Sequence, residues 1–284
     1  MVCCVGLLLA LSGCAGVLDP AGPIGAGNRI LLLNALAIML AIVIPTIVAL
    51  LVFAFWFRAS NPRATYRPDW AFSGRIELIV WSIPALVVLF LSGVIWIGSH
   101  QLDPATPIRS RTKALEVQVV SLDWKWLFLY PGQGMASVNR LVVPVGVPVH
   151  FTLTSASVMN AFFVPRLGSM IYTMNGMATQ LNLQADRPGT YYGQSAHFSG
   201  DGFANMHFQV DAVPPAQFEG WVASVRGAGP VLDRAGYDAL ARPTLGAPAM
   251  TYRAIDPRLF DAVVRQAIPP ASGPVVQASP KPRA

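Results

Sequence analysis

Two long apolar stretches occupy the first third of the chain. Residues 30–57 carry no charged side chain, and residues 76–98 carry one, Glu77. About 20 apolar residues are enough for a helix to cross a bilayer, so both stretches are predicted to be transmembrane helices. Trp81 and Trp96 lie near the ends of the second stretch, where indole rings favour the membrane interface.

The pattern changes to short, β-rich runs over residues 114–213. Turn signals such as Pro131-Gly132 and Pro188-Gly189 separate the runs. Several short strands at regular spacing predict an all-β sandwich or barrel. The predicted strands cover residues 115–121, 124–130, 140–144, 147–154, 178–184, 189–194 and 206–211.

The remainder of the chain, residues 214–266, is predicted to be a short mixed helical region. Residues 218–226, 231–241 and 257–266 can form short amphipathic helices. Residues 267–284 are rich in Pro, Ala and Ser, a composition that predicts a disordered tail.

Composition and charge place the chain in a membrane. Hydrophobic residues make up 54% of the 284 positions and charged residues 12%, which indicates a membrane protein with a substantial soluble part. The loop 58–75 carries four arginines against Asp69, so it is predicted to be cytoplasmic, with both flanking regions on the opposite side. The net charge of +6 is concentrated in residues 226–284, and no nucleic-acid motif accompanies it.

The three cysteines, Cys3, Cys4 and Cys14, all lie within the first fourteen residues. Leu11-Ser12-Gly13-Cys14 resembles a bacterial lipobox, which predicts a signal peptide over 1–13, an acylated Cys14 and an outer linker over 14–29. An ordinary signal peptide or a chance cysteine is the alternative. No Lys or Arg precedes Cys14, which departs from the usual positive start of a signal peptide.

A glycine-punctuated loop between two predicted strands, residues 191–206, reads YYGQSAHFSGDGFANM. Sites for soft metals need thiolate or imidazole donors, and no cysteine lies near this loop. The histidines His100, His150, His197 and His207 do not show ligand spacing and are predicted to be structural or surface residues. Neither a nucleophile–base motif nor a phosphate loop is present, so we predict no catalytic, cofactor or metal site in this chain.

Four segments together resemble subunit II of the haem–copper terminal oxidases. They are ELIVWSIP at 77–84, DWKW at 123–126, SVMNAFFVP at 157–165 and the loop 191–206. In copper-containing members, the resemblance places copper ligands where this sequence has Asn160, Ser195, Ser199 and Phe203, with Met206 retained. The vacated positions resemble the quinol-oxidising, bo-type branch, and imply a cupredoxin-like Greek-key domain without copper over 114–213.

This resemblance implies a non-catalytic subunit of a proton-translocating ubiquinol oxidase in a bacterial inner membrane. Haems and copper are then expected in subunit I, smaller membrane subunits are further partners, and ubiquinol is the substrate of the complex. Docking of cytochrome c is not expected, because residues 101–225 hold seven basic and seven acidic side chains and offer no acidic patch.

Glu77 has two readings. A carboxylate in the first turn of a helix is stabilised by the helix dipole. The resemblance instead implies a proton-uptake group at the mouth of a channel shared with subunit I, and ionisable residues at membrane depth often mark such paths.

Two alternatives for the function stay open. One is a diverged cytochrome c oxidase subunit, which requires a copper site that these residues do not supply. The other is a membrane-tethered β-domain lipoprotein that acts in oxidase assembly or periplasmic binding. Co-purification with a haem-bearing partner distinguishes the last from an oxidase subunit.

Overall fold

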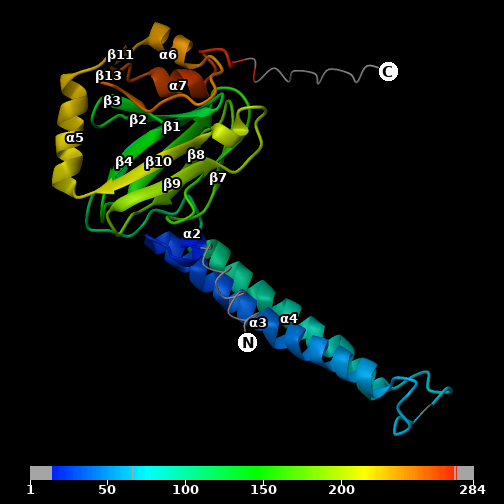
Figure 1. Ribbon diagram of the computed structural model, residues 1–284. Helices are drawn as coiled ribbons and strands as arrows, with labels where there is room; N and C mark the ends of the chain where they lie inside the picture. The colour runs from blue at the N-terminus through cyan, green and yellow to red at the C-terminus, as the bar shows by residue number, and fades with distance from the viewer. Residues whose placement is uncertain (1–14, 66, 272, 274–284) are drawn as a thin grey trace, which may run out of the picture. The chain divides into compact units, whose positions relative to one another are not determined.

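The computed structural model describes residues 15–65, 67–271 and 273 (Figure 1). The chain divides into two compact units. Residues 29–103 form a helical unit, and the described residues before and after them form a β unit.

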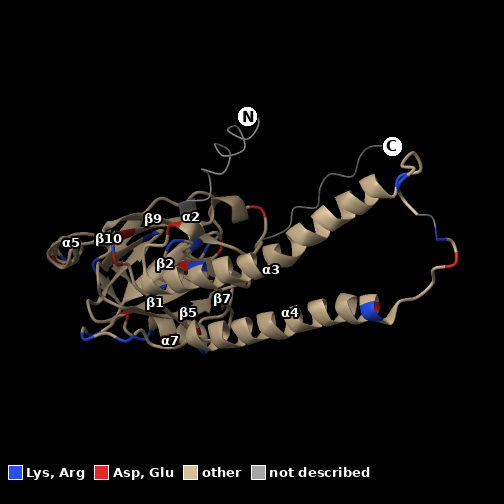
Figure 2. Cartoon of the chain, turned by 90° about the horizontal axis from the view of Figure 1, so that it is seen from below, with Lys and Arg blue, Asp and Glu red and all other residues tan. Residues whose placement is uncertain are grey.

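The helical unit is a pair of long apolar helices. α3 (Pro23–Trp56) belongs to this unit from Arg29 onward, and α4 (Gly74–Gln101) follows after a loop. Both helices are long and apolar enough to cross a membrane, and Figure 2 shows charged residues gathered in the loop that joins them. Gly98 lets the two helices approach, since a Cβ there would lie 2.8 Å from the Leu31 side chain. The helices extend beyond the predicted 30–57 and 76–98 at three of their four ends.

The β unit has two main sheets. The six-stranded sheet has the order β12-β3-β2-β1-β5-β8, and the five-stranded sheet has the order β4-β10-β9-β6-β7. The pairs β1–β5 and β4–β10 are parallel. The strands of the first sheet are β1 (Leu115–Leu122), β2 (Lys125–Tyr130), β3 (Met135–Val138), β5 (Val149–Ser155), β8 (Thr179–Leu183) and β12 (Met250–Tyr252). Those of the second are β4 (Arg140–Pro144), β6 (Asn160–Phe163), β7 (Ile171–Thr173), β9 (Gly189–Ser195) and β10 (His207–Val213).

The six-stranded sheet is buried on both faces, which its sequence explains. Side chains alternate between the faces of a strand, and β2 is apolar at both sets of positions. Trp126 and Phe128 point into the core between the two sheets, whereas Leu127 and Leu129 belong to a second core on the other face.

The C-terminal region covers that second face. α6 (Arg234–Leu240) and α7 (Leu259–Val264) lie over the six-stranded sheet in Figure 1, and Tyr237, Leu240 and Phe260 bury their side chains there. β11 (Val231–Leu232) pairs with β13 (Ala254–Ile255). α5 (Pro215–Gly227) instead adds Phe218, Val222 and Val225 to the core between the sheets.

Two predicted boundaries are wrong. Residues 267–271 were expected to be disordered, but Ile268 is buried in the second core and Ala271 N donates to Ala156 O at 2.9 Å. Apolar burial of one side chain and backbone pairing outweigh the unfavourable composition there. The expected linker 14–29 contains α2 (Ala15–Leu18) and the first turns of α3. Pro23 suits a helix start because its fixed φ is already helical.

The residues that lead into α3, and the first residues of α3 itself, are attached to the rest of the β unit by backbone hydrogen bonds. Ala21 N donates to Arg166 O at 2.7 Å, Asp186 N donates to Ala21 O at 2.7 Å, and Gly25 N donates to Leu167 O at 3.0 Å. Asp19 adds ion pairs to Arg166 and Arg187. We call residues 19–25 the N-terminal clasp.

Candidate functional site

Four of the five positions that the sequence resemblance relates to copper ligands lie close to one another in the β unit. Asn160 begins β6 and Ser195 ends β9, and these strands pair through Phe162 and Ser195. Ser199 and Met206 follow in the loop before β10. All four side chains are buried. The fold therefore brings these four side chains into one buried group.

Hydrogen bonds occupy the polar atoms of this group. Ser195 Oγ lies 3.2 Å from Asn160 Oδ1 and 3.1 Å from His197 O, so its single proton has two acceptors within reach. Asn160 Nδ2 donates to Val158 O at 3.2 Å. Ser199 Oγ lies 3.9 Å from Met206 Sδ. The result is a closed polar cluster in a mostly apolar setting.

These residues do not fit a copper centre. The donors are hydroxyls, an amide and one thioether, and copper sites with mixed sulfur and nitrogen ligands require thiolates and imidazoles. Within the described residues, no three His, Cys, Asp or Glu side chains gather as potential metal ligands. No electron-transfer step can be derived through copper in this domain.

The backbone of Phe203 contacts the polar cluster. Its carbonyl accepts a hydrogen bond from Met206 N at 3.0 Å, and its ring packs at 5.6 Å on the ring of Phe198, which is 73% exposed. Phe203 therefore forms an aromatic pair with the exposed Phe198 ring.

The indole ring of Trp124 packs against the loop between β9 and β10. Its backbone has φ 63°, and its indole Nε1 donates to Ser199 O at 3.0 Å. A Cβ at Gly202 would overlap the indole ring, so this position accepts only glycine without displacement. Trp124 therefore sets the path of the loop between Ser199 and Gly202.

Asp123 and Lys125, on either side of Trp124, are buried charges. Ser157 Oγ donates to Asp123 Oδ1 at 2.5 Å, and no hydrogen-bond partner within the described part of the chain reaches Asp123 Oδ2. Lys125 Nζ donates to Leu240 O at 2.8 Å and Arg242 O at 2.6 Å. Burial lowers the pKa of Lys125, while the nearby Asp123 carboxylate raises it.

Lys125 therefore has a structural role. Its ammonium group satisfies carbonyls at the C-terminal end of α6, where a helix leaves its last carbonyl groups unpaired. It ties the C-terminal region to β2. The sequence alone indicated no role for this lysine. An isolated Lys between aromatic residues in a strand is the signal that could have found it.

Trp126 is fully buried and packs against Phe162 and Phe208 with ring centroids 5.3 and 5.6 Å apart. Trp126 is therefore a central residue of the core between the two sheets.

The four histidines lie apart and contact different neighbours. His150 Nδ1 is 2.9 Å from Asn182 Oδ1. His100 packs on Trp96, His197 on Tyr172 and His207 on Tyr192. The structure does not bring them together as ligands.

Glu77 and Cys14 complete the predicted site residues. Glu77 lies in the first turn of α4 with an exposed side chain, and its backbone N–H donates to Ser73 O at 3.0 Å. Cys14 lies outside the described residues.

Comparisons with known proteins identify both parts of the β unit. The family described as cytochrome c oxidase subunit II, periplasmic domain, matches residues 116–213, and the family described as COX aromatic rich motif matches residues 226–270. Among solved structures, the periplasmic domain of subunit II of cytochrome oxidase from Bradyrhizobium japonicum is similar, with 27% identity, coverage of 40% of this chain and 96% of that chain, and a TM-score of 0.38.

Relatives match nearly the whole chain. It is 47% identical over 259 residues to ubiquinol oxidase subunit 2 of Acetobacter aceti, covering 90% of this chain and 84% of that protein. It is 46% identical over 261 residues to cytochrome bo(3) ubiquinol oxidase subunit 2 of Pseudomonas putida, covering 92% and 83%. The predicted fold class, two apolar helices followed by a cupredoxin-like domain, is confirmed. The chain belongs to the ubiquinol oxidase subunit 2 family of the haem–copper oxidases.

Proposed function

We propose that this chain is the non-catalytic subunit 2 of a proton-translocating ubiquinol oxidase. The observation that carries the proposal is the closed polar cluster at the copper-ligand positions, in which Ser195 and Asn160 bond each other. Without thiolate or imidazole donors there, the β domain has no group to accept an electron. A quinol dissolved in the membrane can deliver electrons directly to a catalytic subunit, so the domain does not need one.

The proposed partner is subunit I, which would hold the haems and copper of the complex, together with smaller membrane subunits. The exposed apolar side chains of α3 and α4 support a location within a membrane assembly. The four arginines of the loop 58–75 support a cytoplasmic loop and an outer β domain in a bacterial inner membrane. The domain would stabilise the outer face of subunit I, and its balanced charge gives no support to cytochrome c docking.

Affinity purification of this chain in mild detergent tests the proposal. We expect a haem spectrum, quinol-driven O2 uptake, and no copper assignable to this chain after the copper of subunit I is accounted for. A pure, colourless and inactive chain would favour the alternative of an assembly or binding lipoprotein. Activity with reduced cytochrome c would contradict the quinol assignment.

Glu77 is proposed as the proton-uptake group of this subunit. Glu77→Ala is expected to slow quinol-driven O2 uptake severalfold without loss of the haem-bearing complex, because a carboxylate at the mouth of the path would relay protons. Glu77→Asp should retain most activity. Asp69→Ala, which removes the carboxylate of the adjacent loop, is the matched control. Unchanged turnover of Glu77→Ala in an intact complex would rule out this role.

Cys14 is proposed as the acylated N-terminus, on the basis of its Leu-Ser-Gly-Cys setting. The intact mass of the purified chain is expected to equal residues 14–284 plus lipid. In Cys14→Ala the lipid mass should disappear. A wild-type mass without lipid would contradict the proposal.

A further inference from the structure

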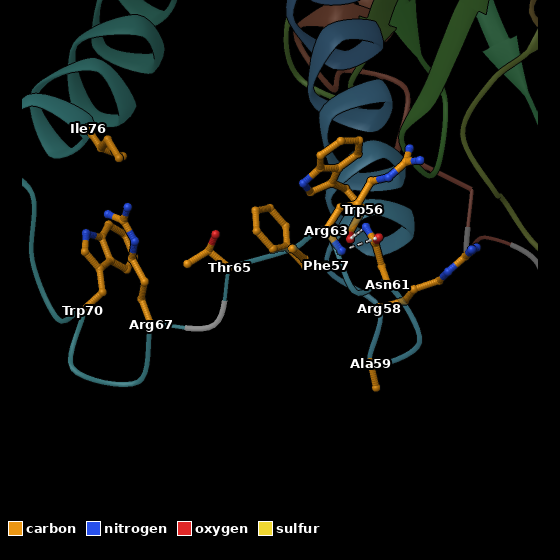
Figure 3. A pocket seen from close by; sticks show the side chains of 11 residues that line it. Trp56, Phe57, Arg58, Ala59, Asn61, Arg63, Thr65, Arg67, Trp70 and Ile76 are labelled. Carbon is orange, nitrogen blue, oxygen red and sulfur yellow. Dashed lines mark hydrogen bonds between the residues drawn. The ribbon is translucent and has the colours of Figure 1, made fainter.

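The end of α3 and the loop before α4 line an open pocket. The function proposed above assigns no role to this pocket. Its volume is about 810 Å³, within the range of small-molecule sites. Figure 3 shows side chains from the end of α3 on one side and from the loop before α4 on the other. The side chains that carry the argument are Trp56, Phe57, Arg58, Arg63, Arg67 and Trp70. We call this cavity the loop pocket.

The arginines of the loop pocket lack internal partners. Arg58, Arg63 and Arg67 are exposed, and within residues 29–65 and 67–103 none of them forms an ion pair with a carboxylate. The Arg58 guanidinium lies 4.3 Å from the centre of the Phe55 ring, a cation–π contact that leaves its N–H donors available. Figure 3 shows the Arg67 guanidinium beside Trp70, whereas Arg58 and Arg63 extend from the α3 side of the pocket away from Trp70. Positive charge without an ion-pair partner therefore lies on both sides of the pocket.

Two hydrogen bonds of the Asn61 side chain fix the backbone at the C-terminal end of α3, beside the loop pocket. Asn61 Nδ2 donates to Trp56 O at 2.5 Å, and Arg63 N donates to Asn61 Oδ1 at 3.1 Å. The first bond satisfies a carbonyl group at the C-terminus of α3, and the second fixes the backbone on which Arg63 stands. Trp56 and Phe57 thus have defined positions beside the arginines.

The chemistry of the pocket matches a phospholipid headgroup. Guanidinium groups bind phosphate through paired hydrogen bonds, and basic pockets beside transmembrane helices on the cytoplasmic side bind anionic headgroups. Trp56, Phe57 and Trp70 are 48%, 60% and 59% exposed, and aromatic rings favour the headgroup level of a bilayer. A soluble anion would need the arginines but not the exposed aromatic rings.

We propose that the loop pocket binds the phosphate group of an anionic phospholipid of the cytoplasmic leaflet, such as cardiolipin or phosphatidylglycerol. Arg67, beside Trp70, contacts the phosphate, Arg63 adds positive charge from the α3 side of the pocket, and the aromatic rings of Trp56 and Trp70 pack on the glycerol and upper acyl groups.

The test uses the complex purified through this chain, titrated with cardiolipin or with phosphatidylcholine of matched acyl chains and measured by native mass spectrometry. Each juxtamembrane arginine contributes about fivefold in affinity, so Arg63→Gln/Arg67→Gln should weaken cardiolipin binding by roughly 25-fold. Arg109→Gln/Arg111→Gln removes the same charge from an exposed segment that follows α4 in the chain and should leave binding unchanged.

Three results would overturn the proposal. The first is equal cardiolipin binding by the wild type and Arg63→Gln/Arg67→Gln. The second is equal affinity of the wild type for cardiolipin and phosphatidylcholine. The third is displacement of cardiolipin by inorganic phosphate that binds with the same arginine dependence, which would assign the pocket to a free anion.

Discussion

Gly22→Ala is expected to lower the free energy of unfolding by about 3 kcal/mol, through loss of three backbone hydrogen bonds of about 1 kcal/mol each. A Cβ at residue 22 would overlap the carbonyl oxygen of Gln184. Because the obstacle is a backbone atom of the residue that directly follows β8, the N-terminal clasp must move away instead. The bonds from Ala21, Asp186 and Gly25 are then broken together.

Denaturant unfolding of the full chain in detergent, followed by tryptophan fluorescence, measures this loss. Hydrogen exchange should also show reduced protection over residues 19–25. Gly16→Ala is the matched control, since its Cβ would lie at an ordinary 3.7 Å from Pro165. If Gly22→Ala kept wild-type protection over the clasp, the proposed attachment would be wrong.

Tyr130→Phe is expected to destabilise the β unit by about 2–4 kcal/mol, because it leaves two buried backbone groups without partners. The Tyr130 hydroxyl donates to Val142 O at 3.1 Å and accepts from Val142 N at 2.9 Å. Tyr130 belongs to the six-stranded sheet and Val142 to the edge strand β4 of the other sheet. One hydroxyl therefore completes the hydrogen bonding of an edge strand and joins the two sheets.

The same unfolding measurement tests this prediction. Tyr192→Phe removes a hydroxyl from a side chain that is 54% exposed and should change the free energy of unfolding little. Equal stability of Tyr130→Phe and the wild type would mean that Val142 finds other partners at no cost.

Alkaline pH is expected to lower the free energy of unfolding through the Tyr130 hydroxyl. Burial raises the pKa of Tyr130 above its ordinary value, which is about 10. Above about pH 10 the unfolded state loses the phenolic proton while the folded state keeps it. The contribution of this group to stability is complete below pH 10 and is lost as the pH rises through the folded pKa. Tyr130→Phe should show a smaller alkaline loss of stability than the wild type, and an identical loss would contradict the assignment.

Hydrophobic patterning predicted most of the architecture. The charge-free run 30–57 and the run 76–98 correspond to α3 and α4, because length and hydropathy are sufficient to specify a spanning helix. Short strand-like runs bounded by turn signals predicted β1, β2 and β9 to within one or two residues. Short strands were missed: β3, β6 and β7 have three or four residues each, too few for a period of two to be recognised.

In the candidate site, too, features that depend on local spacing are visible in the sequence, whereas features that depend on strand pairing are not. The spacing of Ser195, Ser199 and Met206 in one loop is visible along the chain, and it carries part of the resemblance to a copper-binding loop. The bond between Ser195 and Asn160 depends on the pairing of β6 with β9, which joins residues 35 positions apart. Pairing of strands distant in sequence leaves no local pattern.

The sequence by itself determined the two spanning helices, the β-rich domain and the absence of thiolate and imidazole donors from the copper-ligand positions, because these follow from residue type and local spacing. Only the tertiary structure decided that residues 19–25 form backbone hydrogen bonds with the rest of the β unit, that Lys125 Nζ donates to a carbonyl group at the end of α6, and that Ile268 is buried in the second core. Each of those features joins segments separated by more than a hundred residues. Their stabilisation arises from burial and hydrogen bonding that exist only once the sheets have formed.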